Sequence, residues 1–327
     1  MTKISVIIPV YGVEAFIERS ASNLFSQTLR EVEFIFVDDA TPDNSVPLIE
    51  KCLKSFPERA SQVQILRHSE NRGLPAARNT GLAIARGEYI YHCDSDDWME
   101  PRMLEIMYEA AHSSDADIVY CDFYLSFEKN ERYMSTPDYE TAEKMLRKGF
   151  LAGCMKYNVW NKLVKRRIYT ENAILFPEGH PMGEDMTMIR LAACANKVSH
   201  IAEGLYHYVK LNKGAYSNSY SPQKLNDIRY NTDQTLSFLH NRFGNTIEED
   251  LTSFQLSIKL PFLLTDDKTL YKLWEEWYPE ANRFANSNKE LPVRTRLLQW
   301  MAAKRQWWYV KLYYRLIYKF IYGVIYK

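Results

Sequence analysis

Short apolar runs alternate with longer amphipathic stretches over the first 125 residues. The apolar runs, rich in Val, Ile, Phe and Tyr as strands usually are, cover residues 4–10, 32–39, 63–68, 88–93 and 117–125. Between them, apolar positions at helical spacing predict helices over 13–29, 44–55, 74–86 and 101–113. This β-α-β-α order predicts an α/β fold with a mostly parallel sheet and helices on both faces. The strands are continuously apolar, which agrees with burial on both faces.

The pattern becomes less regular after residue 125. Residues 126–215 combine aromatic and glycine-containing loops with helical pieces near 141–150 and 184–195, and the pattern is helical from about 221 onward. We therefore divide the chain into a core at 1–125, a second part of the same domain at 126–215 and a helical C-terminal extension at 216–327. At the end of the third helix we expect Gly87 to act as the stop signal.

Composition and charge narrow the class of protein. The 41 basic residues balance 41 acidic ones, so the net charge gives no reason to expect a nucleic-acid partner. The five cysteines are scattered and odd in number, which favours reduced thiols in a cytoplasmic protein. No uncharged apolar run approaches the ~20 residues of a membrane-spanning helix.

The last 37 residues differ from the rest of the chain. After Glu290 there is no acidic residue, and eight cations stand among ten aromatic residues. The helical spacing places Lys304, Lys311, Arg315 and Lys319 on one face and Val310, Ile317, Ile321 and Val324 on the other. This pattern predicts a basic amphipathic helix that binds the inner face of the cell membrane peripherally. Packing on the catalytic domain, or a dimer contact, is the alternative.

Carboxylates gather where the predicted strands end. Asp38-Asp39 closes one strand, and another runs straight into Asp94-Ser95-Asp96-Asp97. Ligands of open α/β sheets bind at the carboxyl ends of the strands. In an extended segment Asp94 and Asp96 point the same way, and Mg²⁺ or Mn²⁺ is held by one or two carboxylates plus phosphate oxygens. In the alternative interpretation, Asp97 caps the next helix and the other acids are solvated.

Several rival functions lack their sequence features. The chain has neither G-x-x-x-x-G-K-[ST] nor G-x-G-x-x-G after a strand, which argues against P-loop and dinucleotide-binding proteins. A nucleotidylyltransferase would need a glycine-rich basic loop after the first strand, where only Gly12 and an acid occur. A D-x-D-x-T hydrolase would carry its acidic pair at the end of that strand. A metal-dependent nucleotidylyltransferase and a non-catalytic, membrane-associated scaffold nevertheless remain as alternatives.

Taken together, the motifs resemble a known family. "VIIPVYG", "VEFIFVDDATPDNS", "NRGLPAARNTGLAIARGEYIYHCDSDDW", "WNKL" and "GED" are similar to glycosyltransferase family 2, the inverting GT-A enzymes. The resemblance is strong over residues 3–125 and weaker to about 210. It implies a GT-A (Rossmann-like) core that binds a nucleotide-sugar, followed by an acceptor-binding part. The implied reaction moves a sugar, from a UDP-sugar in the first instance, to a hydroxyl of a saccharide or lipid-linked saccharide, as in surface polysaccharide synthesis.

The resemblance also implies roles for individual residues. Around the donor it places Pro9, Tyr11, Glu14, Asp39, Asn71, Gly73, Arg78 and Asp94. Within this set, Asp39 would hydrogen-bond the base and Asp94 the ribose or sugar hydroxyls. Asp96 would bind the divalent metal, Mn²⁺ or Mg²⁺.

A second group of implied roles falls after residue 125. Asp185 would be the catalytic base, with Glu184 beside it as the other candidate. Both acids would equally suit a helix N-terminus, where they complement the dipole. Trp160 and Lys162 would frame the acceptor. For His207 we favour a structural role over metal or acceptor binding.

Overall fold

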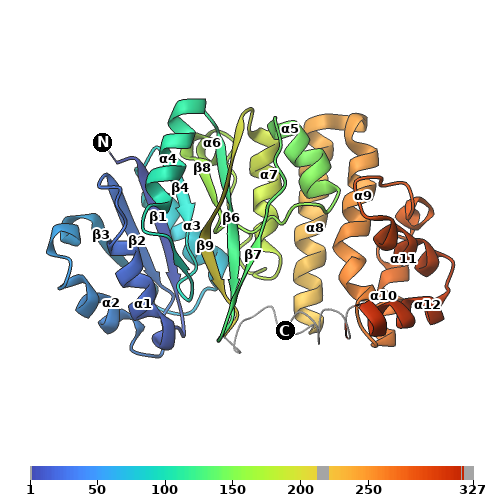
Figure 1. Ribbon diagram of the computed structural model, residues 1–327, viewed down its shortest axis with the longest axis horizontal. Coiled ribbons are helices and arrows are strands. Elements are labelled where there is room, and N and C mark those ends of the chain that lie inside the picture. Colours follow the sequence, from blue (N-terminus) through green and yellow to red (C-terminus); the bar gives the residue numbers. More distant parts are fainter. Residues whose placement is uncertain (1, 212–220, 318, 320–327) are drawn as a thin grey trace. The chain divides into compact units, whose positions relative to one another are not determined.

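The computed structural model describes residues 2–211, 221–317 and 319 (Figure 1). The chain forms two compact units, Met1–Glu143 with Tyr157–Thr235 and Lys144–Lys156 with Leu236–Lys327. The first unit contains the sheet, and the second is helical. The three-part division drawn from the sequence stays a prediction beside these two units.

The first four strands of the sheet are parallel, as the sequence predicts. They are β1 (Ile4–Val10), β2 (Val32–Asp38), β3 (Val63–Arg67) and β4 (Tyr89–His92), in the order β3-β2-β1-β4. Their carboxyl ends therefore lie along one edge. This edge receives the loops that carry the predicted donor-site residues.

The second half of the sheet is mixed. The strand β8 (Lys162–Lys165) pairs antiparallel with both β4 and β6 (Ile118–Ser126), and β9 (Val198–Val209) runs parallel to β6. Two short strands, β5 (Trp98–Met99) and β7 (Glu131–Met134), pair antiparallel with β9 and β6. The α/β fold class and the helical C-terminal region are confirmed, but only the first half of the sheet is parallel throughout. The strands β7 and β8 were missed because they fall in the irregular aromatic region, and β5 because it has only two residues.

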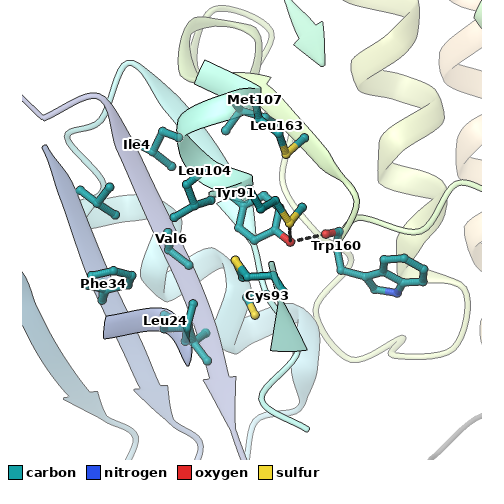
Figure 2. Packing of buried hydrophobic residues seen from close by; sticks show 14 of the residues in the cluster. Ile4, Val6, Leu24, Phe34, Tyr91, Cys93, Leu104, Met107, Trp160 and Leu163 are labelled. Carbon is teal, nitrogen blue, oxygen red and sulfur yellow. Dashed lines mark hydrogen bonds between the residues drawn. The ribbon is translucent and has the colours of Figure 1, made fainter. Parts of the chain in front are cut away.

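Helices cover both faces of the sheet. On one face, Ile4 and Val6 of β1 pack with helices α1 (Glu14–Phe25) and α4 (Met103–Ser114), and α2 (Ser45–Leu53) joins the same core (Figure 2). On the other, Ile7 contacts the helix α3 (Leu74–Ile84) so closely that a methyl group on Gly81 would lie 2.5 Å from its Cγ2. Alternate residues of a strand point to opposite faces, so one apolar run supplies two cores.

The first unit has further short helices. The helix η1 (Pro57–Gln62) contacts α2 and β2 in the first half of the sheet, whereas α6 (Arg166–Glu171) contacts β8 in the second half and also α7 (Thr187–Cys194), which follows η3 (Glu184–Met186). The helix α5 (Ala142–Lys144) ends at the border with the second unit. The long helix α8 (Pro222–Phe243) begins in the first unit and ends in the second.

The second unit is built from short helices. They are η2 (Met145–Leu151), η5 (Gly244–Ile247), α9 (Glu248–Lys259), η6 (Leu260–Leu263), α10 (Lys268–Glu276), η7 (Pro279–Phe284), α11 (Val293–Ala303) and α12 (Trp307–Tyr313). Trp274 is fully buried among them, and the buried Lys259 donates from Nζ to the carbonyl of Trp277 at 2.6 Å. Among the described residues, no helix is both long and apolar enough to cross a membrane.

The predicted single C-terminal helix is wrong in its first part. α11 ends at Ala303, Arg305 takes a left-handed backbone with φ of 57°, and α12 begins at Trp307. Lys304 therefore does not share a helix with Lys311. The predicted positions Ile321 and Val324 lie outside the described residues.

Gly87 has a different function from the predicted helix stop. The helix α3 already ends at Ile84, because Ala85 adopts an extended backbone. Gly87 lies instead against β1, where a Cβ atom would be 2.4 Å from the backbone nitrogen of Ser5. Its own N–H donates to the Ser5 hydroxyl at 2.8 Å. The residue is glycine because the two backbones approach closely.

We expect Gly87→Ala to destabilise the protein by roughly 1–3 kcal/mol, because the new methyl group forces the loop off β1. Urea unfolding measures the change. Gly179→Ala is the comparison, since its methyl group would meet no atom within 4 Å and only the left-handed backbone is strained. An equal loss in both variants would contradict the close-approach explanation.

Candidate active site

One buried arginine binds three carboxylates at the edge of the sheet. Arg78 of α3 donates from Nη1 to Glu184 Oε1 at 2.9 Å and to Asp185 Oδ1 at 3.4 Å. Its Nη2 donates to Asp94 Oδ1 at 3.1 Å. Its side chain is only 2% exposed. The structure therefore brings together four predicted site residues from three segments that are distant in the sequence.

The two neighbouring acids differ in accessibility. The Glu184 side chain is 11% exposed and makes the shorter contact with Arg78, whereas that of Asp185 is 31% exposed. A group that takes a proton from an incoming hydroxyl must be reachable by it. The geometry therefore favours Asp185 over Glu184 as the base.

Electrostatics oppose full ionisation of this cluster. Burial, and then the charge of Asp185, raises the pKa of Glu184 to about 8. Burial also raises the pKa of Asp185, while Arg78 lowers it. Near Arg78, burial and then the charge of the guanidinium hold the pKa of His92 well below its usual range, so this imidazole stays neutral. One guanidinium thus faces three acids, and near neutral pH the acids share a proton.

The loop that carries Glu184 and Asp185 is held by residues that sequence reasoning missed. Gly183 takes a left-handed backbone with φ of 87° just before η3. Asn231 of α8 donates from Nδ2 to the carbonyls of His180 and Met182, each at 3.0 Å. The rings of His180 and Tyr230 stack with centroids 3.7 Å apart. The polar positions of α8 carried no local signal, because their partners lie about 50 residues away.

Asp39 organises the loop before α3. Its Oδ1 accepts the backbone N–H of Arg72 and its Oδ2 that of Gly73, each at 2.8 Å. Its Oδ1 also lies 2.6 Å from His68 Nδ1. The predicted loop residue Asn71 is exposed. The predicted contact of Asp39 with a nucleotide base stays a prediction, and the structure adds a scaffolding role.

The predicted residues at the end of β1 and just after it differ in their surroundings. Pro9 is buried within the strand, and Tyr11 is 51% exposed. Glu14 accepts the backbone N–H of Asn44 at 3.1 Å, and its own N–H donates to Asp43 at 2.9 Å. Glu14 thereby ties the start of α1 to the loop after β2, and Tyr11 and Glu14 are both exposed.

Trp160 and Lys162 are buried rather than surface residues. Trp160 stacks on Tyr206 at 4.6 Å between ring centroids. Lys162 donates from Nζ to the Asn158 carbonyl at 2.7 Å and to Asn161 Oδ1 at 2.8 Å. Burial lowers the pKa of Lys162 to about 7, while the charge of Asp185 opposes the shift. The burial disfavours direct contact with an acceptor and leaves Lys162 as a buried amine within electrostatic reach of Asp185.

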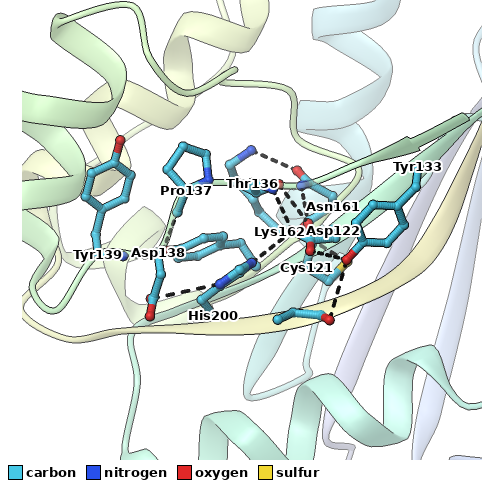
Figure 3. Close-up of polar contacts among 12 residues, drawn as sticks. Cys121, Asp122, Tyr133, Thr136, Pro137, Asp138, Tyr139, Asn161, Lys162 and His200 are labelled. Carbon is cyan, nitrogen blue, oxygen red and sulfur yellow. Dashed lines mark hydrogen bonds and ion pairs between the residues drawn. The ribbon is translucent and has the colours of Figure 1, made fainter. Parts of the chain in front are cut away.

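A second polar network surrounds Lys162 (Figure 3). Asp122 accepts the backbone N–H of Thr136 at 2.6 Å and lies 2.9 Å from His200 Nε2. Asn161 donates to the Cys121 carbonyl at 2.7 Å. These bonds fasten the segment after β7 and the start of β8 to β6. They thereby fix the segments that surround Lys162.

His207 is structural, as favoured from the sequence. Its ring stacks on Trp98, with centroids 3.4 Å apart, and on Tyr124 at 4.8 Å. Its Nδ1 lies 2.8 Å from Glu131 and its Nε2 lies 3.0 Å from Glu100. Both ring nitrogens are thus occupied by carboxylates.

Comparison with known proteins agrees with this geometry. Residues 5–183 match the family model described as Glycosyl transferase family 2. The chain belongs to glycosyltransferase family 2. It is 31% identical over 275 residues to an uncharacterized glycosyltransferase, EpsJ, of Bacillus subtilis, covering 80% of this chain and 77% of that one. It is 28% identical to the cholesterol galactosyltransferase of Borreliella burgdorferi, covering 84% and 80%.

The fold matches a solved glycosyltransferase. The crystal structure of Staphylococcus aureus TarS 1–349 in complex with UDP-GlcNAc superimposes with a TM-score of 0.65, at 19% identity, over 96% of this chain and 92% of that one. This family-2 glycosyltransferase is therefore an enzyme of the transferase class with a GT-A fold. That assignment replaces the nucleotidylyltransferase and scaffold alternatives.

The acidic loop after β4 of this glycosyltransferase carries an excess of negative charge. Asp97 is fully buried and accepts the Tyr206 hydroxyl at 2.8 Å and the Val209 N–H at 2.7 Å. Burial, and then the charges of Asp96 and Asp94, raises its pKa well above the usual range. The helix α4 begins at Met103 with Arg102 as its N-cap, so the alternative that Asp97 caps this helix is wrong.

The acidic loop after β4 offers ligands of the kind that divalent cations prefer. No cluster of three or more metal-ligating side chains occurs in residues 2–211, 221–317 and 319. Asp94 and Asp96 supply two hard carboxylates, both partly exposed. Two carboxylates plus substrate phosphates are a usual ligand set for Mg²⁺, and a cation would relieve the mutual repulsion. The residues therefore fit a metal that binds together with a diphosphate.

We predict that stability in the absence of ligands falls as pH rises, because Glu184 is protonated when folded. Its pKa rises from 4.5 to about 8, so between these values the folded state binds the extra proton. The free energy of unfolding should decrease by roughly 2–4 kcal/mol across this window, and Glu184→Gln should flatten the decrease. Guanidinium unfolding at several pH values measures it. Glu203→Gln, at an exposed site, should keep the wild-type slope; an unchanged slope in Glu184→Gln would refute the assignment.

Proposed function

We propose that this chain is an inverting glycosyltransferase that moves a sugar from a UDP-sugar to a hydroxyl of a saccharide or lipid-linked saccharide, in surface polysaccharide synthesis. The observation that carries the proposal is the Arg78–Asp94–Glu184–Asp185 cluster at the carboxyl edge of the sheet. UDP-GlcNAc in the TarS complex supports a UDP-sugar as donor. The cholesterol galactosyltransferase, at 28% identity, supports an acceptor carried by a lipid.

In this proposal Asp185 takes the proton of the acceptor hydroxyl during attack on the anomeric carbon. Attack from the side opposite the leaving diphosphate inverts the configuration. Arg78 holds Asp185 and Glu184 in place, and burial together with the charge of Asp185 keeps Glu184 protonated nearby. A carboxylate with a raised pKa is a better base for a hydroxyl than an ordinary aspartate.

The donor would occupy the edge next to this cluster. Tyr11 offers an open ring after β1, and the loop 71–73 is fixed by Asp39 before α3. Asp94, which binds Arg78 in the cluster, would accept hydrogen bonds from hydroxyls of the ribose or the sugar. Asp96, with Asp94, would hold Mn²⁺ or Mg²⁺, which when bound supplies Lewis-acid stabilisation of the leaving diphosphate.

The proposal is tested by thermal shift with UDP and GDP, with and without Mn²⁺, together with hydrolysis of UDP-sugars. We expect a UDP-selective, Mn²⁺-dependent shift that Asp96→Asn abolishes. Asp185→Asn should keep the shift but lose about 10²–10⁴-fold in turnover, more than Glu184→Gln. No shift with any nucleotide in folded protein would overturn the function, and a shift with GDP alone would overturn the UDP donor.

We also propose that the C-terminal helices bind an anionic membrane surface. α11 exposes Val293, Leu297 and Trp300, and the segment 307–317 exposes Trp308, Leu312 and Leu316, by 38% to 70%. Each trio recurs at three- or four-residue spacing, so it forms one stripe on its helix. No acid occurs after Glu290, and the nearby cations suit anionic headgroups. Exposed tryptophans are typical of the membrane interface.

Sedimentation with vesicles tests this surface. We expect binding to phosphatidylcholine vesicles only when they contain phosphatidylglycerol, weakening with salt, and a loss of about tenfold in Trp308→Glu and Leu312→Glu. Leu175→Glu changes an equally exposed leucine of the first unit and should bind like wild type. Undiminished binding in both stripe variants would contradict the proposal, as would a change only in their oligomeric state.

A further inference from the structure

The helical unit has a groove of its own. It lies between the end of α8, the helix α9 and η7, and its volume is about 580 Å³. Ligand-binding pockets commonly measure about 300–1,000 Å³. The lining residues all come from the second unit and from beyond residue 183, where the match to the family model ends. The groove is therefore separate from the carboxylate cluster and is not part of the shared family pattern.

The lining combines uncharged polar groups with one open aromatic ring. Hydroxyl groups come from Ser237 and Thr252, and amide groups come from Asn241 and Gln255. Phe284 is 40% exposed at the groove. Such hydroxyl and amide groups can both donate and accept hydrogen bonds. A sugar ring needs this combination, because its hydroxyls are paired donors and acceptors and its C–H face is apolar.

The charges in the groove argue against other ligands. The guanidinium of Arg283 lies over the Phe284 ring, 4.7 Å from the centroid. Two carboxylates, Glu248 and Glu280, also line the groove, and Glu248 Oε1 lies 2.8 Å from His240 Nδ1. The lining offers no cluster of cations for phosphate or another anion, because Glu280 stands beside Arg283 and His240 is paired with Glu248. The lining is too polar for a lipid tail, which would leave these groups without water or partners.

From these contacts we infer that the groove is a second saccharide-binding site that holds an uncharged part of the acceptor chain. The inference rests on the proposed function, in which the acceptor is a saccharide. A second binding site for the acceptor raises the effective concentration of the acceptor at the active site, without any new contact at the reacting hydroxyl. The planar side chains Gln255 and Arg283 would bind hydroxyls, and the Phe284 ring would stack on a sugar face.

The test is binding of the full-length chain to an array of short neutral, amino-sugar, uronic-acid and sulfated oligosaccharides. We expect neutral or N-acetylated glycans to bind, with a loss of about tenfold, or ~1.4 kcal/mol, in Phe284→Ala and Gln255→Ala. Phe284→Tyr keeps the ring and should retain binding. Lys272→Ala, on the exposed surface of α10, is the matched control and should bind like wild type.

Three outcomes would overturn the inference: no neutral glycan bound, binding only of acidic glycans, or undiminished binding in both Phe284→Ala and Gln255→Ala. The thermal shift with UDP is measured on the same variants and should not change. If the wild type shows the thermal shift with UDP but binds no glycan, only the saccharide site in the groove is rejected. If the wild type shows neither the thermal shift with UDP nor glycan binding, the proposed function is rejected.

Discussion

The catalytic half of the molecule depends on a single buried cation. Arg78 is inaccessible to solvent, yet it joins α3 to the loop after β4 and to η3. Removing a buried charge leaves its partners uncompensated, which costs more than the bond itself contributes. Here three carboxylates would face each other without a cation. The sheet edge can therefore concentrate acids only because α3 delivers this guanidinium among them.

The cluster also determines which acid is available for chemistry. Glu184 is less exposed than Asp185, and burial with the neighbouring charge of Asp185 keeps it protonated despite its short contact with Arg78, whereas Asp185 remains accessible. The neutral His92 and the buried Lys162 influence the electrostatics of the cluster from inside the protein. Two adjacent residues of the same chemical type thus differ in protonation and accessibility through their burial and their mutual repulsion, and the proposed function assigns them different roles.

Local patterns predicted the first half of the sheet because its strands are apolar and its connections are helices. They also brought Asp38-Asp39 and Asp94-Ser95-Asp96-Asp97 to one edge, since parallel strands end together, whereas Glu184 and Asp185 were implied only by the resemblance to the family. What they missed depends on contacts far along the chain. The antiparallel β8 is a four-residue strand whose partners are β4 and β6, and Asn231 supports a loop about 50 residues away. Burial of Trp160 and Lys162, and the close approach at Gly87, likewise follow from packing that no local pattern encodes.

The loop before α3 shows how such an enzyme can change its preference without losing its shape. Asp39 binds this loop through the main-chain N–H groups of Arg72 and Gly73, and only Gly73 needs a special backbone angle. Main-chain bonds do not depend on side-chain identity, so substitutions at positions 71 and 72 can leave these bonds intact, although replacing Arg72 also removes its ion pair with Glu178 at 3.0 Å. Evolution, or an engineer, can therefore change the side chain at position 71 while the loop keeps its path. In the proposed function, where this loop borders the donor, position 71 is accordingly the one to randomise when a different donor is sought.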